Sequence, residues 1–73
     1  MRDVVVFEGK DWSNIVPCAI SREALEDHFY GDNKDKLKVF IANRERIEHE
    51  ARRKYLSGRA EPDGSILIRT DDV

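Results

Sequence analysis

The sequence predicts an α+β fold in which a small antiparallel sheet of three or four strands packs on a two-helix hairpin, in the order β-β-α-α-β. Two observations predict it. β-Branched and aromatic residues gather in short runs near both ends of the chain, and helical periodicity fills the middle. At 73 residues, the chain is expected to form a single domain over residues 1–73, near the size at which one core is only just sufficient.

The first two predicted strands lie within residues 4–20. The run Val4-Val5-Val6-Phe7 favours one strand and residues 15–20 favour a second, with a loop that holds Trp12 between them. Pro17 cannot donate a ladder hydrogen bond. We therefore expect the second strand to lie at an edge of the sheet or to bulge at this proline.

Two helices are predicted next. Ser21 is the expected N-cap of the first, which runs through "REALEDHF" and ends at Gly31. Asp32 or Asn33 would cap the second, a helix of about six turns that Ser57-Gly58 closes. Its apolar residues repeat at threes and fours, at Leu37, Phe40, Ile41, Ile47, Ala51 and Tyr55.

The C-terminal part is predicted to return to the sheet. The turn sequence "EPDG" precedes a strand over residues 65–70, for which residues 59–61 are a candidate partner. Residues 71–73 are expected to be a loose tail. The predicted core comprises Val4, Val6, Ile20, Leu25, Phe29, Leu37, Phe40, Ile41, Ile47, Ala51, Tyr55, Ile66 and Ile68.

Composition argues against several classes of function. Thirteen basic and fifteen acidic side chains give a net charge of −2, unlike a dedicated polyanion binder. Cys18 is the only cysteine, which excludes a disulfide within the chain and favours a reducing, cytoplasmic setting. No signal peptide is apparent, and no stretch approaches the ~20 apolar residues of a membrane span.

The segment "NRERIEHEARRKY", residues 43–55, is densely charged. On a helix, most of these side chains point to water. Nucleic-acid binding is the alternative, although acids interleave with the bases. Adjacent residues such as Glu48 and His49 diverge by ~100° on a helix, so we expect no metal site, and no cofactor is expected. The candidate nucleic-acid contacts are Arg46, Arg52, Arg53 and Arg59.

Two candidate binding positions stand out. Arg44 falls within the predicted apolar stripe, and Glu48 is one turn further on. Either Arg44 bridges Glu48 or an acid of the first helix as a packing contact, or the two residues face a cleft or a partner chain. Trp12 either caps the sheet or, if exposed, anchors a partner.

Cys18 and His28 suggest a nucleophile and a base. Cys18 lies among apolar residues, and no glycine-rich oxyanion or phosphate loop accompanies either residue. We therefore expect no enzyme. A ligand-binding or enzymatic domain around Cys18, His28 and Arg44 is the third hypothesis, and it requires one pocket that joins all three.

One resemblance covers nearly the whole chain. "PCAISREALEDHF", Phe40, "NR" at 43–44, "IE" at 47–48, Ala51 and Tyr55 resemble a family of small bacterial proteins, domain of unknown function 1488. The resemblance implies a compact fold of a few strands and two helices, and it brings no activity, cofactor or catalytic residue. The leading hypothesis is a small cytoplasmic protein-interaction or regulatory module, without catalytic activity, that works through a protein partner or as a homodimer.

Overall fold

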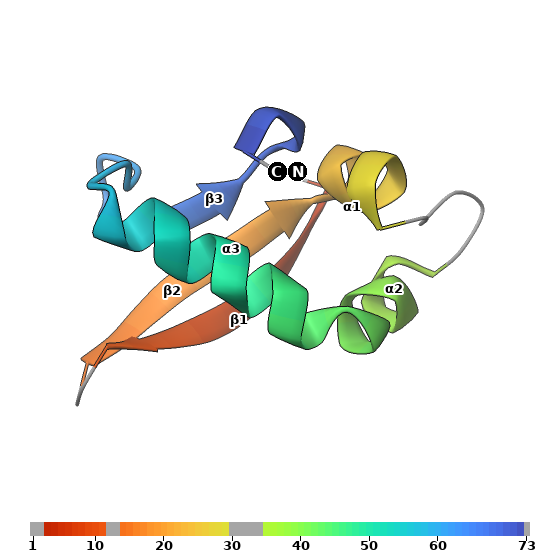
Figure 1. The fold of residues 1–73 in the computed structure, drawn as a ribbon, viewed down its shortest axis with the longest axis horizontal. Helices are drawn as coiled ribbons and strands as arrows, with labels where there is room; N and C mark the ends of the chain where they lie inside the picture. Colours follow the sequence, from red (N-terminus) through yellow and green to blue (C-terminus); the bar gives the residue numbers. More distant parts are fainter. Residues whose placement is uncertain (1–2, 12–13, 30–34, 73) are drawn as a thin grey trace.

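The computed structural model describes residues 3–11, 14–29 and 35–72, and it confirms the α+β class (Figure 1). Three α-helices are present in these residues rather than two. The elements are β1 (Val4–Asp11), β2 (Asn14–Ser21), α1 (Arg22–His28), α2 (Lys36–Ala42), α3 (Arg44–Leu56), β3 (Ile66–Ile68) and a 3-10 turn, η1 (Thr70–Asp72).

The sheet has the strand order β1-β2-β3 and is mixed rather than wholly antiparallel. β1 and β2 form an antiparallel hairpin, whereas β3 pairs with β2 in parallel, with Cys18 opposite Ile66. The reason is the connection. Helix α3 carries the chain back along the sheet, so that β3 starts from the same end as β2.

Pro17 lies in the central strand, so the expectation of an edge strand is wrong, and the pairing of β1 with β2 is continuous, without a bulge. The amide of Arg22 donates to the carbonyl of Asp3 (2.9 Å), so Arg22 directs its N–H toward the first strand. Because amides alternate in direction along an antiparallel strand, the nitrogen of Pro17 points away from β1. Pairing with β3 begins one residue later, at Cys18, so the missing N–H costs no bond in the described ladder.

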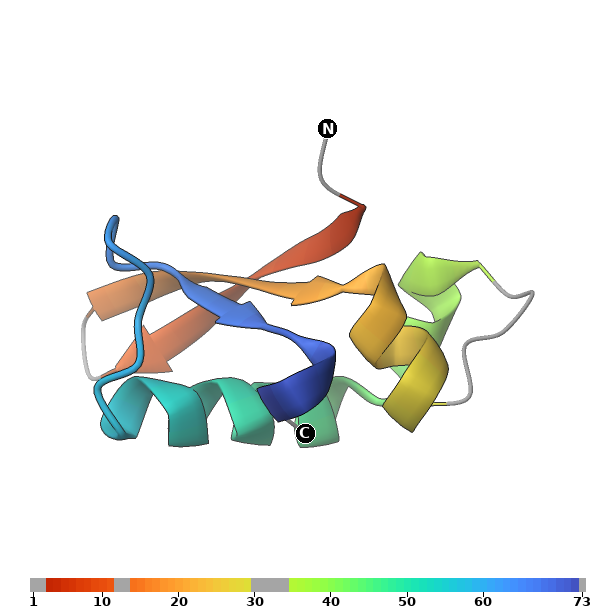
Figure 2. The ribbon, with the colours of Figure 1, turned by 90° about the horizontal axis from the view of Figure 1, so that it is seen from above.

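The core lies between the sheet and α3, which crosses one face of it (Figure 2). The prediction of Val4 and Val6 as core residues is wrong: Val5 and Phe7 are buried, and Val6 is 74% exposed. Because all four residues favour a strand, the sequence does not reveal whether the odd-numbered or the even-numbered side chains face inward. In the structure the odd-numbered side chains face the core. The buried cluster comprises Val5, Phe7, Cys18, Ile20, Ala24, Leu25, Phe29, Val39, Phe40, Ile47, Ala51, Ile66 and Ile68.

The predicted long helix is two helices that meet at Asn43. This residue leaves the helical conformation (φ −120°, ψ 18°), and its Nδ2 donates to the carbonyl of Val39 (2.9 Å). The buried residues of α2 are Val39 and Phe40, whereas Leu37 and Ile41, predicted as core, are exposed. The stripe on α2 is therefore rotated by about one residue, or ~100°, from the one that a continuous helix would carry.

The caps of the first two helices agree only in part with expectation. The Oγ of Ser21 accepts from the amide of Ala24 (3.1 Å), as an N-cap should. The N-cap of α2 is Asp35, whose carboxylate accepts from the amide of Leu37 (2.9 Å). The expected cap at Asp32 or Asn33 and the expected stop at Gly31 lie outside the described residues.

The C-terminal part is anchored by a lysine of the densely charged segment 43–55. Lys54 of α3 is buried, and its Nζ donates to the carbonyl of Leu67 (2.6 Å) and to Asp72 (2.8 Å). Asp72 belongs to η1, where it also accepts from the amide of Arg69 (2.8 Å), so residues 71 and 72 are not a loose tail. Residues 59–61, which the structure describes, do not form the expected strand. The amide of Glu61 instead donates to the carbonyl of Ser65 (2.8 Å) and closes a turn.

Candidate functional site

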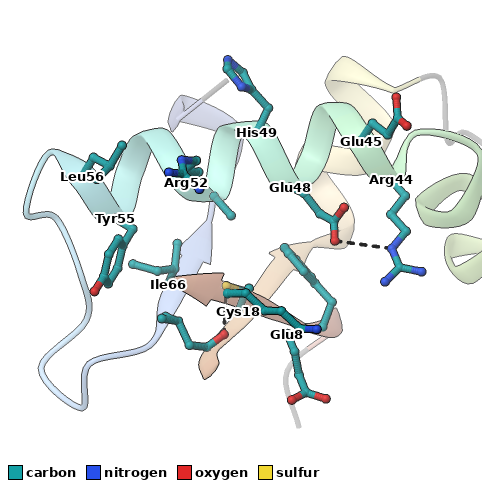
Figure 3. Close-up of a pocket in the computed structure, with 15 residues that line it drawn as sticks. Glu8, Cys18, Arg44, Glu45, Glu48, His49, Arg52, Tyr55, Leu56 and Ile66 are labelled. Carbon is teal, nitrogen blue, oxygen red and sulfur yellow. Dashed lines mark hydrogen bonds and ion pairs between the residues drawn. The ribbon is translucent and has the colours of Figure 1, made fainter. Parts of the chain in front are cut away.

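A groove of about 470 Å³ opens between α3 and the half of the β1–β2 hairpin nearest its turn (Figure 3). It exists because three of its lining residues, Gly9, Cys18 and Ala51, have side chains too small to fill the space between helix and sheet. We call it the α3 groove. Its apolar lining is completed by Phe7, Val16, Tyr55, Leu56 and Ile66.

Gly9 and Cys18 are in close contact on the sheet side of the α3 groove. A Cβ on Gly9 would lie 3.1 Å from the Sγ of Cys18, closer than most carbon–sulfur contacts. The thiol is buried and donates to the carbonyl of Val16 (3.4 Å). Burial raises the pKa of Cys18; the Gly9 amide opposes this shift, and the charge of Glu48 adds to it. A thiol held in its protonated form is a weak nucleophile.

Arg44 and Glu48 form an ion pair at one end of the groove, with 3.4 Å between Nε and Oε2. Their side chains are 65% and 39% exposed. Arg44 is the first residue of α3, after the break at Asn43, so it does not lie in a buried stripe as a continuous helix would have it. It does bridge Glu48, but on the surface of the groove rather than between packed helices.

The charges that face the α3 groove are mostly positive. Glu8, Glu45 and His49 contribute to its lining, yet Figure 3 shows their side chains directed away from it. Arg52, one turn beyond Glu48, and Lys10 of β1 also line it, both exposed. Neither of these two cations forms an ion pair with another described residue.

The structure does not join the three residues of the enzymatic hypothesis. Cys18 and Arg44 line the same groove, but His28 does not. The Nε2 of His28 lies 2.8 Å from the carbonyl of Thr70, where α1 meets η1. A nucleophile–base arrangement of Cys18 and His28 is therefore wrong for this fold. Trp12 lies outside the described residues.

The four candidate nucleic-acid contacts are dispersed. Arg46 lies over the ring of Phe29, 4.9 Å from its centroid. Arg53 pairs with Glu50 (3.2 Å). Arg59 donates to the hydroxyl of Ser57 (3.0 Å) and lies 3.8 Å from Asp72. Three of the four thus have local partners, and the fourth, Arg52, lines the α3 groove.

Sequence reasoning missed two features of this site. Arg52 was assigned to a nucleic-acid surface, although its i,i+4 spacing from Glu48, itself i,i+4 from Arg44, places all three on one helix face. The close contact of Gly9 with Cys18 was not predicted, because no local signal reveals a contact across the strands. No group of three or more metal-binding side chains occurs among the residues that the structure describes.

A three-stranded mixed sheet with α3 across one face and a groove beneath that helix defines a small α+β protein with a helix-covered sheet. The chain belongs to the family described as protein of unknown function (DUF1488), whose model matches residues 1–68. No curated protein and no solved structure matches it. In the described part of the chain, no helix combines the length and apolar character needed to span a membrane.

Proposed function

We propose that this protein is a non-catalytic protein-interaction module of the bacterial cytoplasm, and that it binds its partner through the sheet face opposite α3. The observation that carries the proposal is that no described helix covers this face (Figure 2). We call it the outer sheet face. Its apolar residues on β1 and β2 are Val4, Val6, Ile15, Pro17 and Ala19, and on β3 the buried Leu67 lies opposite Ala19.

The register places these apolar side chains on one side of the sheet. Val6 lies opposite Ala19, while Ile15, Pro17 and Ala19 alternate along β2 and so share one side of the strand. Val6 and Ile15 are 74% and 61% exposed. Apolar side chains left exposed as a group, rather than singly, are typical of interaction sites.

The face of the sheet suits a partner better than its edge does. β1 is an edge strand, and its half nearest the hairpin turn carries Glu8 and Lys10. Charged residues on an edge strand discourage pairing with another chain. A partner that packs across the sheet needs no such pairing: it buries Val6 and its neighbours and meets Glu8 and Lys10 on the same side of β1.

The absence of catalysis in this proposal rests on the site geometry. Burial raises the pKa of the Cys18 thiol, which donates to a backbone carbonyl, and His28 lies at a different part of the fold. Nucleic-acid binding is disfavoured, because three of the four basic residues proposed for it have local partners and the net charge is −2.

The test compares the wild type with two lysine variants. Val6→Lys places a charge on the outer sheet face, and the matched control Ile41→Lys places one at an exposed apolar position on α2. Light scattering at high micromolar concentration measures self-association, and a tagged pull-down from bacterial lysate, with and without nuclease, measures capture of other proteins. We expect self-association or protein capture in the wild type and Ile41→Lys, and its loss in Val6→Lys.

Three outcomes would contradict the proposal. One is a strict monomer that captures no protein. Another is a Val6→Lys variant that associates as the wild type does. Capture that nuclease abolishes would support the nucleic-acid alternative instead, and should then weaken steeply with added salt.

A further inference from the structure

We propose that the α3 groove binds a small organic carboxylate with an apolar body. The groove lies on the α3 side of the sheet, and the outer sheet face lies on the other (Figures 2 and 3). The inference therefore goes beyond the interaction proposed above and does not depend on it.

The size and lining of the groove suit a small molecule. Its volume of about 470 Å³ falls within the range of roughly 300–1,000 Å³ that small-molecule sites occupy. The floor is apolar, with Phe7, Val16 and Ile66 on the sheet side and Tyr55 on the helix side. Such a floor favours an aromatic or branched aliphatic body over an inorganic ion.

The charges favour a carboxylate over an amine. Arg44, Glu48 and Arg52 recur at every fourth residue of α3, about 6 Å apart along its axis. Glu48 is engaged by the Nε of Arg44 at 3.4 Å, which leaves the two Nη groups of that guanidinium for a ligand. Arg52 has no ion-pair partner among the described residues. Two guanidinium groups and one already paired acid thus border an apolar floor.

A guanidinium group binds a carboxylate with two parallel hydrogen bonds, and these charge-assisted bonds are stronger than neutral ones. A monocarboxylate whose apolar body enters between α3 and the hairpin satisfies both the floor and the rim.

The test uses 4-phenylbutyrate and its neutral analogue 4-phenylbutyramide as probes, titrated into the ¹⁵N-labelled full chain and followed by NMR. We expect saturable shifts concentrated in α3 and in residues 7–10 and 16–18. The acid should bind at least about fivefold more tightly than the amide, because only the acid gains the charge-assisted bonds.

Two variants on one helix test the role of charge. Arg52→Gln should weaken binding of 4-phenylbutyrate about threefold or more and leave binding of the amide unchanged. Arg53→Gln is the matched control, since Arg53 is an exposed arginine of α3 that does not line the groove. The Val6→Lys variant, altered only on the outer sheet face, should bind 4-phenylbutyrate as the wild type does.

The proposal is overturned if the acid and the amide bind equally, if both arginine variants weaken binding alike, or if the shifts lie outside the groove. Lack of saturation up to about 10 mM acid, well above the 1 mM dissociation constant of a weak ligand, would also overturn it. Urea denaturation of each variant verifies that a lost signal does not come from loss of folding.

Discussion

Gly9 and Cys18 show how a single hydrogen atom in place of a side chain maintains the α3 groove. A methyl group at position 9 would lie 3.1 Å from the sulfur of Cys18, which is buried and cannot easily move. We expect Gly9→Ala to lower the free energy of unfolding by about 1–2 kcal/mol, the usual cost of overpacking. Urea denaturation measures the change.

The double variant tests the cause of that loss. Cys18→Ala removes the sulfur, so adding Gly9→Ala to it should cost much less than Gly9→Ala costs in the wild type. Additive losses would show instead that the cost of Gly9→Ala does not come from the sulfur, and the contact with Cys18 would then be incidental.

Contacts of this kind set the limit of what the sequence could predict at the residue scale. Ser21 was predicted as an N-cap, because its bond to Ala24 is local in sequence. The inward parity of β1 was not, since Val4 to Phe7 all favour a strand and only the pairing with β2 decides which face is buried. The burial of Lys54 was not predicted, because its partners, Leu67 and Asp72, are distant in sequence.

At the scale of elements, Asn43 decides the architecture, because it divides the predicted long helix into α2 and α3. Threes-and-fours periodicity predicted helix correctly over most of residues 36–56, but it does not report a break one residue long. The break allows the ring of Phe40 on α2 to pack 5.0 Å from the ring of Phe7 in β1, while α3 continues across the sheet. It also moves Arg44 to a helix start, at the end of the groove.

The side chain of Asn43 stabilises that break. Its Nδ2 donates to the carbonyl of Val39, and alanine would lose this bond while favouring continued helix. We expect Asn43→Ala to lower the free energy of unfolding by about 1 kcal/mol, the typical net contribution of one such hydrogen bond. Thermal unfolding followed by circular dichroism measures it, with Lys38→Ala, an exposed substitution on α2, as control. A more stable Asn43→Ala protein would mean that the break is not stabilised by this side chain.

At the scale of the whole molecule, Lys54 joins α3 to β3 and η1, the last elements of the chain. Both members of the pair with Asp72 are largely buried, at 7% and 14% exposure of their side chains. Removing one partner of such a pair leaves the other charge poorly compensated. We expect Asp72→Asn to lower the free energy of unfolding by about 2 kcal/mol at pH 7, less than a full loss, because asparagine still accepts a hydrogen bond.

The same pair makes stability depend on pH. Burial alone would raise the pKa of Asp72, but the hydrogen bond from Lys54, the amide of Arg69 and the nearby charges of Lys54 and Arg59 hold it below its usual value of 3.8. A carboxyl group whose pKa is lower in the folded state stabilises the fold above its unfolded pKa, and that contribution is lost as pH falls through the folded pKa. The difference in unfolding free energy between the wild type and Asp72→Asn should stay constant from neutral pH down to about pH 5 and shrink below about pH 4. Urea denaturation across this range measures it, with Glu8→Gln, at an exposed acid of β1, as the control substitution. A difference that persists unchanged to pH 2 would show that the loss in Asp72→Asn comes from packing at η1 rather than from the charge of Asp72.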